Sequence, residues 1–148
     1  MTLCNKKINL SSKIKKQILV DFDGGNITGD AGIIIVKQID TELKISKKMS
    51  DSIKDTRDQS KIEHTLEHLL QQRIYQILLG YQDCNDANTL RNDPIFKTVI
   101  DKLPESDIGL AGQSTLSRLE NMVGISDIHA LTSLMVDIYT HKSIPCGI

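Results

Sequence analysis

The segment SKIEHTLEHLLQQRIYQILLG, residues 60–80, decides the fold class of this chain. Ser60 and Glu63 have the S-x-x-E spacing of a capping box, in which two side chains satisfy backbone N–H groups at the start of a helix. Gly80 marks the end, because glycine readily adopts the left-handed conformation that terminates helices. Between them, apolar residues recur at helical spacing: Ile62, Leu66, Leu69, Leu70, Ile74, Ile77 and Leu78. The pattern predicts a helix over residues 61–79 with this apolar face in the core.

The sequence before this helix predicts another helix and a small β element. Asp30 is suited to cap a helix through residues 31–45, in which the helical spacing is kept by Val36, Ile39 and Leu43. Before it, QILVDFDGGNITGD combines β-forming residues with a Gly-Gly-Asn turn signal. This predicts a short strand or hairpin at residues 17–28.

The sequence after it predicts four more helices, over residues 86–91, 94–101, 114–122 and 127–141. Asp93 caps the second of them and Pro94 opens it, because proline is tolerated where no backbone donor is required. Ser114 and Ser126 are the predicted caps of the last two. The final helix is expected to turn four residues inward: Ile128, Leu131, Met135 and Ile138.

Composition agrees with a helical protein of one main domain. Of 148 residues, 39% are hydrophobic but only 3% are aromatic, and there is no tryptophan. A core built mainly from aliphatic side chains favours packed helices over a β-sandwich. We therefore expect a mainly α, compact multi-helix domain at residues 30–141, behind a short N-terminal β strand or hairpin.

Charge is unevenly distributed, although the formal net charge is only −1. The first 20 residues contain no acid and five lysines: Lys6, Lys7, Lys13, Lys15 and Lys16. Such a basic arm, within residues 1–29, is suited to DNA phosphates and is equally typical of a solvated terminus. The near-neutral total gives the whole molecule no electrostatic attraction to nucleic acid or membranes.

Three cysteines, Cys4, Cys84 and Cys146, lie far apart without the spacing of a zinc site or a disulfide framework. We expect reduced thiols in a cytoplasmic protein. No apolar run approaches the roughly 18 to 20 residues that span a bilayer, and no signal peptide is evident at the N-terminus. No membrane partner is expected.

The stretch HTLEH, residues 64–68, matches the H-x-x-E-H pattern of inverted zinc metallopeptidases. On a helix, His64 and His68 would share one face and could bind Zn²⁺, with Glu67 as a general base. The alternative is a pair of surface or half-buried histidines, which we favour because no third ligand is evident. No phosphate-binding glycine loop or nucleophile elbow is present, so we expect no catalytic or metal residue and no cofactor.

The stretch LAGQSTLSRLEN, residues 110–121, is suited to nucleic acid. With Ser114 as the N-cap, the first two turns carry Thr115, Ser117, Arg118 and Asn121. Hydroxyls and backbone N–H groups at a helix N-terminus bind phosphates, and arginine or asparagine reads base edges. The alternative is a surface helix in which Arg118 and Glu120 form ion pairs. A helix-turn-helix with residues 94–101 would need an unusually long turn.

Several segments together resemble the insertion-sequence DDE transposases of group one, which have an RNase H-like core. They are residues 22–46, 64–97 and 110–121, in the family's order, and the match covers most of residues 20–141. The most specific element is R-x-Y-x-x-x-x-G-Y-x-D-x-N-D, from Arg73 to Asp86.

The resemblance implies the N-terminal portion of such an enzyme, engaging the terminal inverted repeats of a mobile element. In this family three acidic residues hold the metal ions that activate the attacking hydroxyl, and no acid here matches them. We therefore expect a non-catalytic portion, truncated before those acids, with residues 142–148 at the start of the missing core. The expected DNA-binding residues are Lys13, Lys15, Lys16, Ser114, Thr115, Ser117, Arg118 and Asn121.

A second hypothesis remains open, in which the region is a structural or dimerisation domain that packs on the catalytic core and has little DNA affinity. The polar residues of the resembling segments are expected to join helices rather than touch DNA: Arg73, Tyr75, Tyr81, Asp83, Asn85, Asp86, Arg91 and Asp93. The partners expected are accordingly DNA, a second copy of the chain, or the catalytic core.

Overall fold

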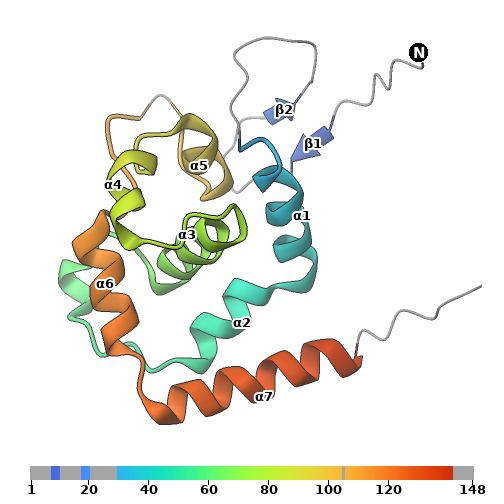
Figure 1. The fold of residues 1–148 in the computed structure, drawn as a ribbon, viewed down its shortest axis with the longest axis vertical. Helices are drawn as coiled ribbons and strands as arrows, with labels where there is room; N and C mark the ends of the chain where they lie inside the picture. Colours follow the sequence, from blue (N-terminus) through green and yellow to red (C-terminus); the bar gives the residue numbers. More distant parts are fainter. Residues whose placement is uncertain (1–7, 11–17, 21–29, 105, 142–148) are drawn as a thin grey trace, which may run out of the picture.

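The computed structural model describes residues 8–10, 18–20, 30–104 and 106–141, and these form a mainly helical protein (Figure 1). The helices are α1 Ile33–Leu43, α2 Ile45–Ser52, α3 Leu66–Leu78, α4 Ala87–Leu90, α5 Pro94–Val99, α6 Gln113–Met122 and α7 Ile125–His141. Two 3-10 turns add to them, η1 Gln59–Lys61 and η2 Cys84–Asp86. The predicted helical class is confirmed. Among the described residues, no helix is long and apolar enough to cross a membrane.

A pair of short strands precedes the helices. Strand β1, Ile8–Leu10, pairs antiparallel with β2, Ile18–Val20, and Ile8 lies opposite Val20. The short strand predicted within residues 17–28 is found as β2, whereas the alternative of a hairpin within that range is not supported, because 18–20 is its only described strand. Its Gly-Gly-Asn turn lies outside the described residues.

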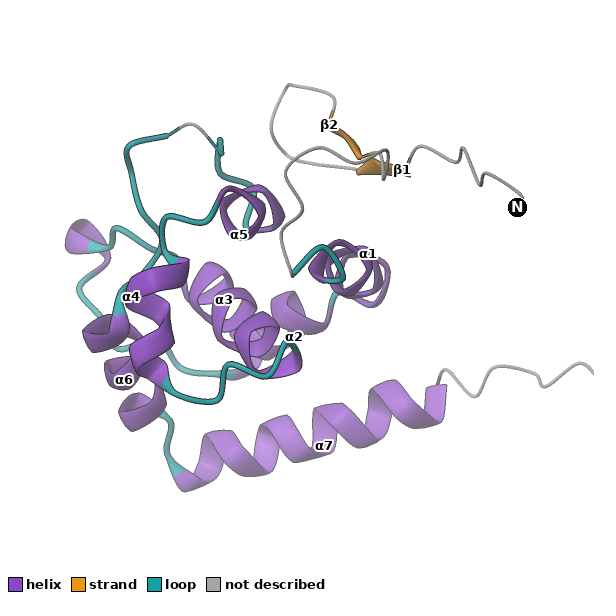
Figure 2. Ribbon diagram, turned by 45° about the horizontal axis from the view of Figure 1, so that its top comes forward, coloured by secondary structure: helices purple, strands orange, loops and turns teal. Residues whose placement is uncertain are grey.

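Helix α3 lies in the middle of the helical domain, with α1, α2, α4, α5 and α6 arranged around it (Figure 2). Its first half contributes Leu66, Leu69 and Leu70 to a core cluster that α6 closes with Leu116 and Leu119. Its second half contributes Tyr75 to another cluster, which is completed by α1, α4, α5 and the segment before α6: Ile33, Ile34, Leu90, Phe96, Val99, Ile100 and Leu110. One central helix therefore fixes the positions of the others.

Helix α3 begins five residues later than predicted. The Thr65 hydroxyl, not that of Ser60, accepts the first capping bond, from the His68 N–H at 3.2 Å. Ser60 belongs instead to η1, where its own N–H donates to the Asp58 carboxylate at 3.1 Å. The predicted stop is confirmed: Gly80 has a φ of 94°, and the Tyr81 N–H reaches back to the Gln76 carbonyl at 2.9 Å.

The buried face of α3 also differs from the apolar stripe that was predicted. Ile77 and Leu78 are 49% and 62% exposed. The buried positions of the second half are instead Gln71, Gln72, Tyr75 and Gln76. Helix α3 therefore packs through polar side chains, which need hydrogen-bond partners in the surrounding elements.

Helix α1 also differs from its prediction, both in its cap and in its buried face. Asp30 does not cap it; the residue before its first turn is Gly32, and the Asp30 carboxylate accepts instead from the Tyr81 hydroxyl at 3.1 Å. Ile39 is 48% exposed. The buried face holds Ile33, Ile34, Lys37 and Asp40.

Helices α6 and α7 begin earlier than predicted, whereas α5 begins at Pro94, as predicted. Asp93 caps α5 as expected, accepting from the N–H groups of Ile95 and Phe96. Helix α6 begins at Gln113, before the predicted cap Ser114, because Gly112 already takes the extended N-cap conformation. Helix α7 begins at Ile125, before Ser126.

The predicted inward face of α7 is half right. Leu131 and Ile138 are half-buried, whereas Ile128 and Met135 are 54% and 41% exposed. Helix α7 packs mainly on α2, and its Leu131 also packs against the core cluster, so only one narrow stripe of the helix is covered (Figure 1).

A buried polar cluster around Asp40 joins α1, α2 and α3. The Asp40 carboxylate accepts from the Tyr75 hydroxyl at 2.7 Å, from the Ser46 N–H at 2.8 Å and from the Ser46 hydroxyl. Burial, and the hydrogen bond to Asp40, raise the pKa of Tyr75, so its hydroxyl stays protonated and donates. Nearby, Lys37 of α1 pairs with Asp101 after α5 at 2.8 Å.

Removing the Tyr75 hydroxyl tests this cluster. Tyr75→Phe leaves a buried carboxylate short of one donor, so the free energy of unfolding should fall by about 2 kcal/mol. Urea unfolding followed by circular dichroism measures the change. Tyr139→Phe is the matched control, because Tyr139 is 82% exposed and should lose almost nothing. Equal stability of both variants and the parent would show that Asp40 does not depend on Tyr75.

Candidate nucleic-acid interface

Helix α6 carries five of the predicted DNA-binding residues, and its packing decides which way they face. Leu116 and Leu119 are buried in the core. The opposite side is therefore turned outward: Ser114, Arg118 and Asn121 are exposed, and Thr115 and Ser117 are half-buried. The three lysines predicted to assist them, Lys13, Lys15 and Lys16, lie outside the described residues.

The N-terminal end of α6 is held by Gln72 of α3. The Gln72 side-chain amide donates to the Ala111 carbonyl at 2.8 Å and accepts from the Ala111 N–H at 3.0 Å. Gln72 is only 2% exposed, so this pair of bonds is shielded from water. In addition, the Asn88 side chain accepts the otherwise free N–H of Gln113 at 3.0 Å. These contacts fix where α6 begins.

The second half of α6 is held by the neighbouring residue of α3, Arg73. Its guanidinium donates to Glu120 at 2.6 Å, to the Tyr81 carbonyl at 3.3 Å and to the Gln82 carbonyl at 2.8 Å. Glu120 is thus engaged by α3, not by Arg118. Arg118 has no hydrogen-bond or ion-pair partner among the described residues, so its charge is available to a ligand.

The remaining residues of the resembling motif are structural. Asp83 caps η2 through the Asn85 N–H, and the Tyr81 hydroxyl joins α3's end to Asp30. Arg91 packs its guanidinium where a side chain on Gly109 would stand. These contacts agree with the expectation that the motif joins helices.

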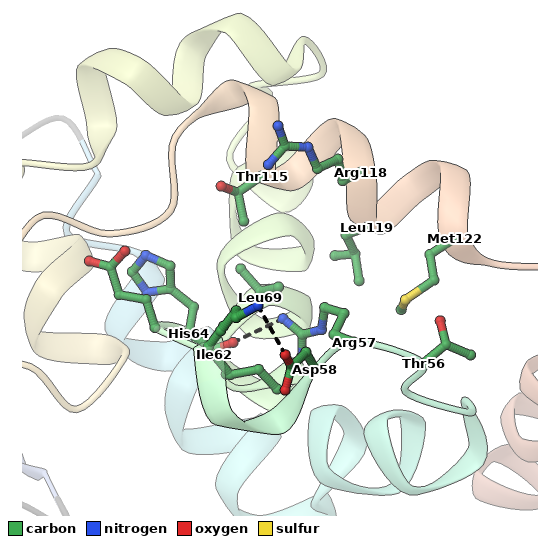
Figure 3. A pocket seen from close by; sticks show the side chains of 12 residues that line it. Thr56, Arg57, Asp58, Ile62, His64, Leu69, Thr115, Arg118, Leu119 and Met122 are labelled. Atoms are coloured by element: carbon green, nitrogen blue, oxygen red, sulfur yellow. Dashed lines mark hydrogen bonds and ion pairs between the residues drawn. The ribbon is translucent and has the colours of Figure 1, made fainter.

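A cavity of about 520 Å³ separates α6 from the segment before α3, and Arg118 and Thr115 stand on its rim (Figure 3). Its floor is apolar, made by Ile62, Leu69, Leu119 and Met122. Facing α6 across it are five charged or titratable side chains: Arg57, Asp58, Lys61, Glu63 and His64. The opening can therefore admit a group that offers negative charge to Arg118.

Three charges of the facing wall, those of Arg57, Asp58 and Lys61, are already engaged in ion pairs or hydrogen bonds. Arg57 donates two bonds to Asp55, at 2.7 and 2.8 Å, and one to the His64 carbonyl at 3.0 Å. This arginine holds the pKa of Asp55 at about 2. Lys61 lies 3.4 Å from Asp58. The sequence pattern gave no indication of Arg57 or Lys61, because both stand in a segment without periodicity.

His64 is a wall residue and not a metal ligand of the predicted kind. It precedes α3, so it does not share a helical face with His68. Its Nδ1 lies 3.4 Å from the Lys102 ammonium, and burial together with this cation lowers the pKa of His64. No cluster of three or more metal-ligating side chains occurs among the described residues.

The predicted helix-turn-helix pairing of residues 94–101 with α6 is not the arrangement observed. Helix α6 packs on α3, α4 and η2. The segment from Ile100 to Gly112 instead runs back past α4, where the Leu110 N–H donates to the Arg91 carbonyl at 2.9 Å. Helix α6 is thus supported by α3, α4 and η2, not by residues 94–101.

Comparison with known families gives one match. The family described as "Transposase DDE domain group 1" matches residues 10–146. No curated protein and no solved structure matches the chain.

The buried His64 predicts a pH dependence of stability. Its folded pKa lies below the ordinary value near 6.5, so the unfolded chain takes up a proton first as the pH falls. The contribution of the uncharged His64 to the free energy of unfolding is therefore complete above about pH 6.5 and is lost as the pH falls toward the folded pKa. Asp55, with a pKa of about 2, does not titrate in this window.

Chemical unfolding at several pH values between 7 and 5 measures this effect. His64→Gln should flatten the decline in the free energy of unfolding, whereas the same change at the exposed His129 should keep it. Parallel declines in the parent and His64→Gln would contradict the assignment.

Proposed function

Because this chain belongs to the transposase DDE domain group 1 family, we propose that it is the DNA-engaging portion of a transposase. Its target is the terminal inverted repeats of the mobile element. The observation that carries the proposal is Arg118: an exposed guanidinium, without a partner among the described residues, on a helix that α3 holds at both ends.

Each predicted residue of α6 has a distinct role in this proposal. Ser114 and Thr115, in the first turn, offer hydroxyls and neighbouring backbone N–H groups to a phosphate. Arg118 reaches a base edge or a second phosphate. Asn121 donates to the Ser117 carbonyl at 2.8 Å, which leaves its side-chain oxygen to accept a bond from a base. Ser117 supports this side from within the helix.

The N-terminal lysines supply attraction that does not depend on sequence. Lys13, Lys15 and Lys16 belong to the basic arm of residues 1–29, and phosphate contacts of this kind weaken steeply with salt. The helical module, residues 30–141, supplies orientation and selectivity. In this proposal, no metal-binding acid and no cofactor is assigned to the helical module.

The thiol chemistry fits a cytoplasmic protein, which we include in the proposal. Cys84 is buried and free, and burial raises the pKa of its thiol above the ordinary value. A protonated, enclosed thiol has little reactivity.

A second candidate function is a structural or dimerisation domain with little DNA affinity of its own. The exposed apolar side of α7 favours it, and so does the net charge of −1. The two candidates differ in the outcome of a DNA titration.

Fluorescence anisotropy with the element's own terminal repeat and a scrambled duplex, each at two salt concentrations, tests the proposal. The repeat should bind more tightly, and Arg118→Ala should weaken that binding by about 1 to 3 kcal/mol and remove the preference. Lys48→Ala removes one exposed charge from α2 and is the matched control, with affinity near that of the parent.

Equal and salt-sensitive binding to both duplexes would restrict the DNA contact to the lysine arm. The absence of binding would exclude the proposal and favour the second candidate.

A further inference from the structure

Helix α7 has two apolar sides, and the fold covers only one of them. Its inner side consists of the half-buried Leu131, Leu134 and Ile138. Leu131 packs against the core cluster shared by α2, α3 and α6. The outer side holds the most exposed apolar residues of the helix: Ile125 at 77%, Ile128 at 54%, Met135 at 41%, Val136 at 55% and Tyr139 at 82%.

The outer residues follow the spacing of a helix–helix seam. Positions 125, 128, 132, 135 and 139 are separated by three, four, three and four residues, which is the a/d repeat of a two-stranded coiled coil. Four of the five are large and apolar. The fifth, Thr132, sits at the centre with its hydroxyl bonded to the Ile128 carbonyl at 2.8 Å, so it brings no unsatisfied donor.

Charge excludes nucleic acid and favours an apolar partner at this surface. The sequence of α7, ISDIHALTSLMVDIYTH, contains no lysine or arginine. Its two acids lie away from the outer seam, and the Asp127 carboxylate is occupied by the Gly124 N–H at 2.9 Å. Within α7 the seam is flanked by no lysine, arginine, aspartate or glutamate that would repel an identical helix.

We propose that the outer seam of α7, residues 125, 128, 132, 135, 136 and 139, pairs with the same seam of a second copy of this chain. A two-fold axis perpendicular to the helices near Thr132 would pair them antiparallel, with Ile125 against Tyr139 and Ile128 against Met135, so that each apolar residue meets another. Burying the five exposed side chains on each copy would remove on the order of 1,000 Å² in total, which reaches the lower limit of a specific interface. The dimer is therefore expected to be weak and concentration-dependent.

The pairing does not depend on the proposed DNA-binding function. It rests on the second candidate function and deepens it by naming the surface and the partner. It uses no residue of α6, and α7 lies along one edge of the molecule, apart from α4 and α5 (Figures 1 and 2). A test without DNA therefore separates the two ideas.

Sedimentation equilibrium of the full chain in reducing buffer, from about 5 to about 200 µM, tests the dimer. The parent should approach twice its 16.5 kDa mass as concentration rises. The double variant Ile128→Glu/Met135→Glu should stay monomeric, with a dissociation constant raised at least about 100-fold, because pairing would bury unpaired carboxylates. Ser126→Glu/Ser133→Glu adds the same charges with the same spacing at exposed positions outside the seam and should still dimerise.

Circular dichroism of each variant verifies that it is folded. Tyr139→Ser, which adds no charge, is a second seam variant and should also weaken the dimer. A parent that stays monomeric up to 200 µM, or a dimer that survives both seam variants, would overturn the proposal.

Discussion

The structure depends on two neighbouring residues of the central helix, Gln72 and Arg73, which hold the two ends of α6. Gln72 pairs with both backbone groups of Ala111, and Arg73 joins Glu120 to the turn at Tyr81. Both side chains make several bonds in a fixed geometry, and an amide or guanidinium that is enclosed in this way allows little rotation. Since Leu116 and Leu119 fix the rotation of α6 about its own axis, the side of α6 that carries Arg118 faces outward before any ligand arrives.

The fixed position of α6 determines which charges of the candidate interface can act on a ligand. Across the cavity, Arg57 and Lys61 are engaged by Asp55 and Asp58, so they stabilise the wall more than they attract a ligand. Arg118 differs because no described acid offsets its charge. A protein of net charge −1 gains little long-range attraction to DNA. Under the proposed function, affinity must therefore come from a few well-placed contacts and from the lysine arm.

Part of this structure could be predicted from sequence. Asp93 before Pro94 marks the start of α5, and Gly80 marks the end of α3, as predicted. Both predictions hold because helix caps are local interactions. The predicted start of α3 was wrong because two residues, Ser60 and Thr65, could each cap the helix. Ser60 instead belongs to the turn that begins at Asp58, and the sequence pattern does not reveal this turn. The predicted buried faces of α1 and α3 were wrong because Lys37, Asp40 and Gln72 are buried with hydrogen-bond partners distant in sequence. The position of α6 in the sequence could be predicted because its pattern is local. The residues that hold it, Gln72 and Arg73, could not be predicted, because they lie far from α6 in the sequence.

Under the proposed function, the outward side of α6 is the surface that meets DNA. Titration of ¹⁵N-labelled protein with the terminal-repeat duplex, followed by backbone amide chemical shifts, tests it directly. Under the proposed function, the largest shift changes are expected in residues 112–121 and in the lysine arm, and the amides of α5 and α7 should stay nearly unchanged. Changes centred on α7, with α6 unaffected at saturating DNA, would contradict it.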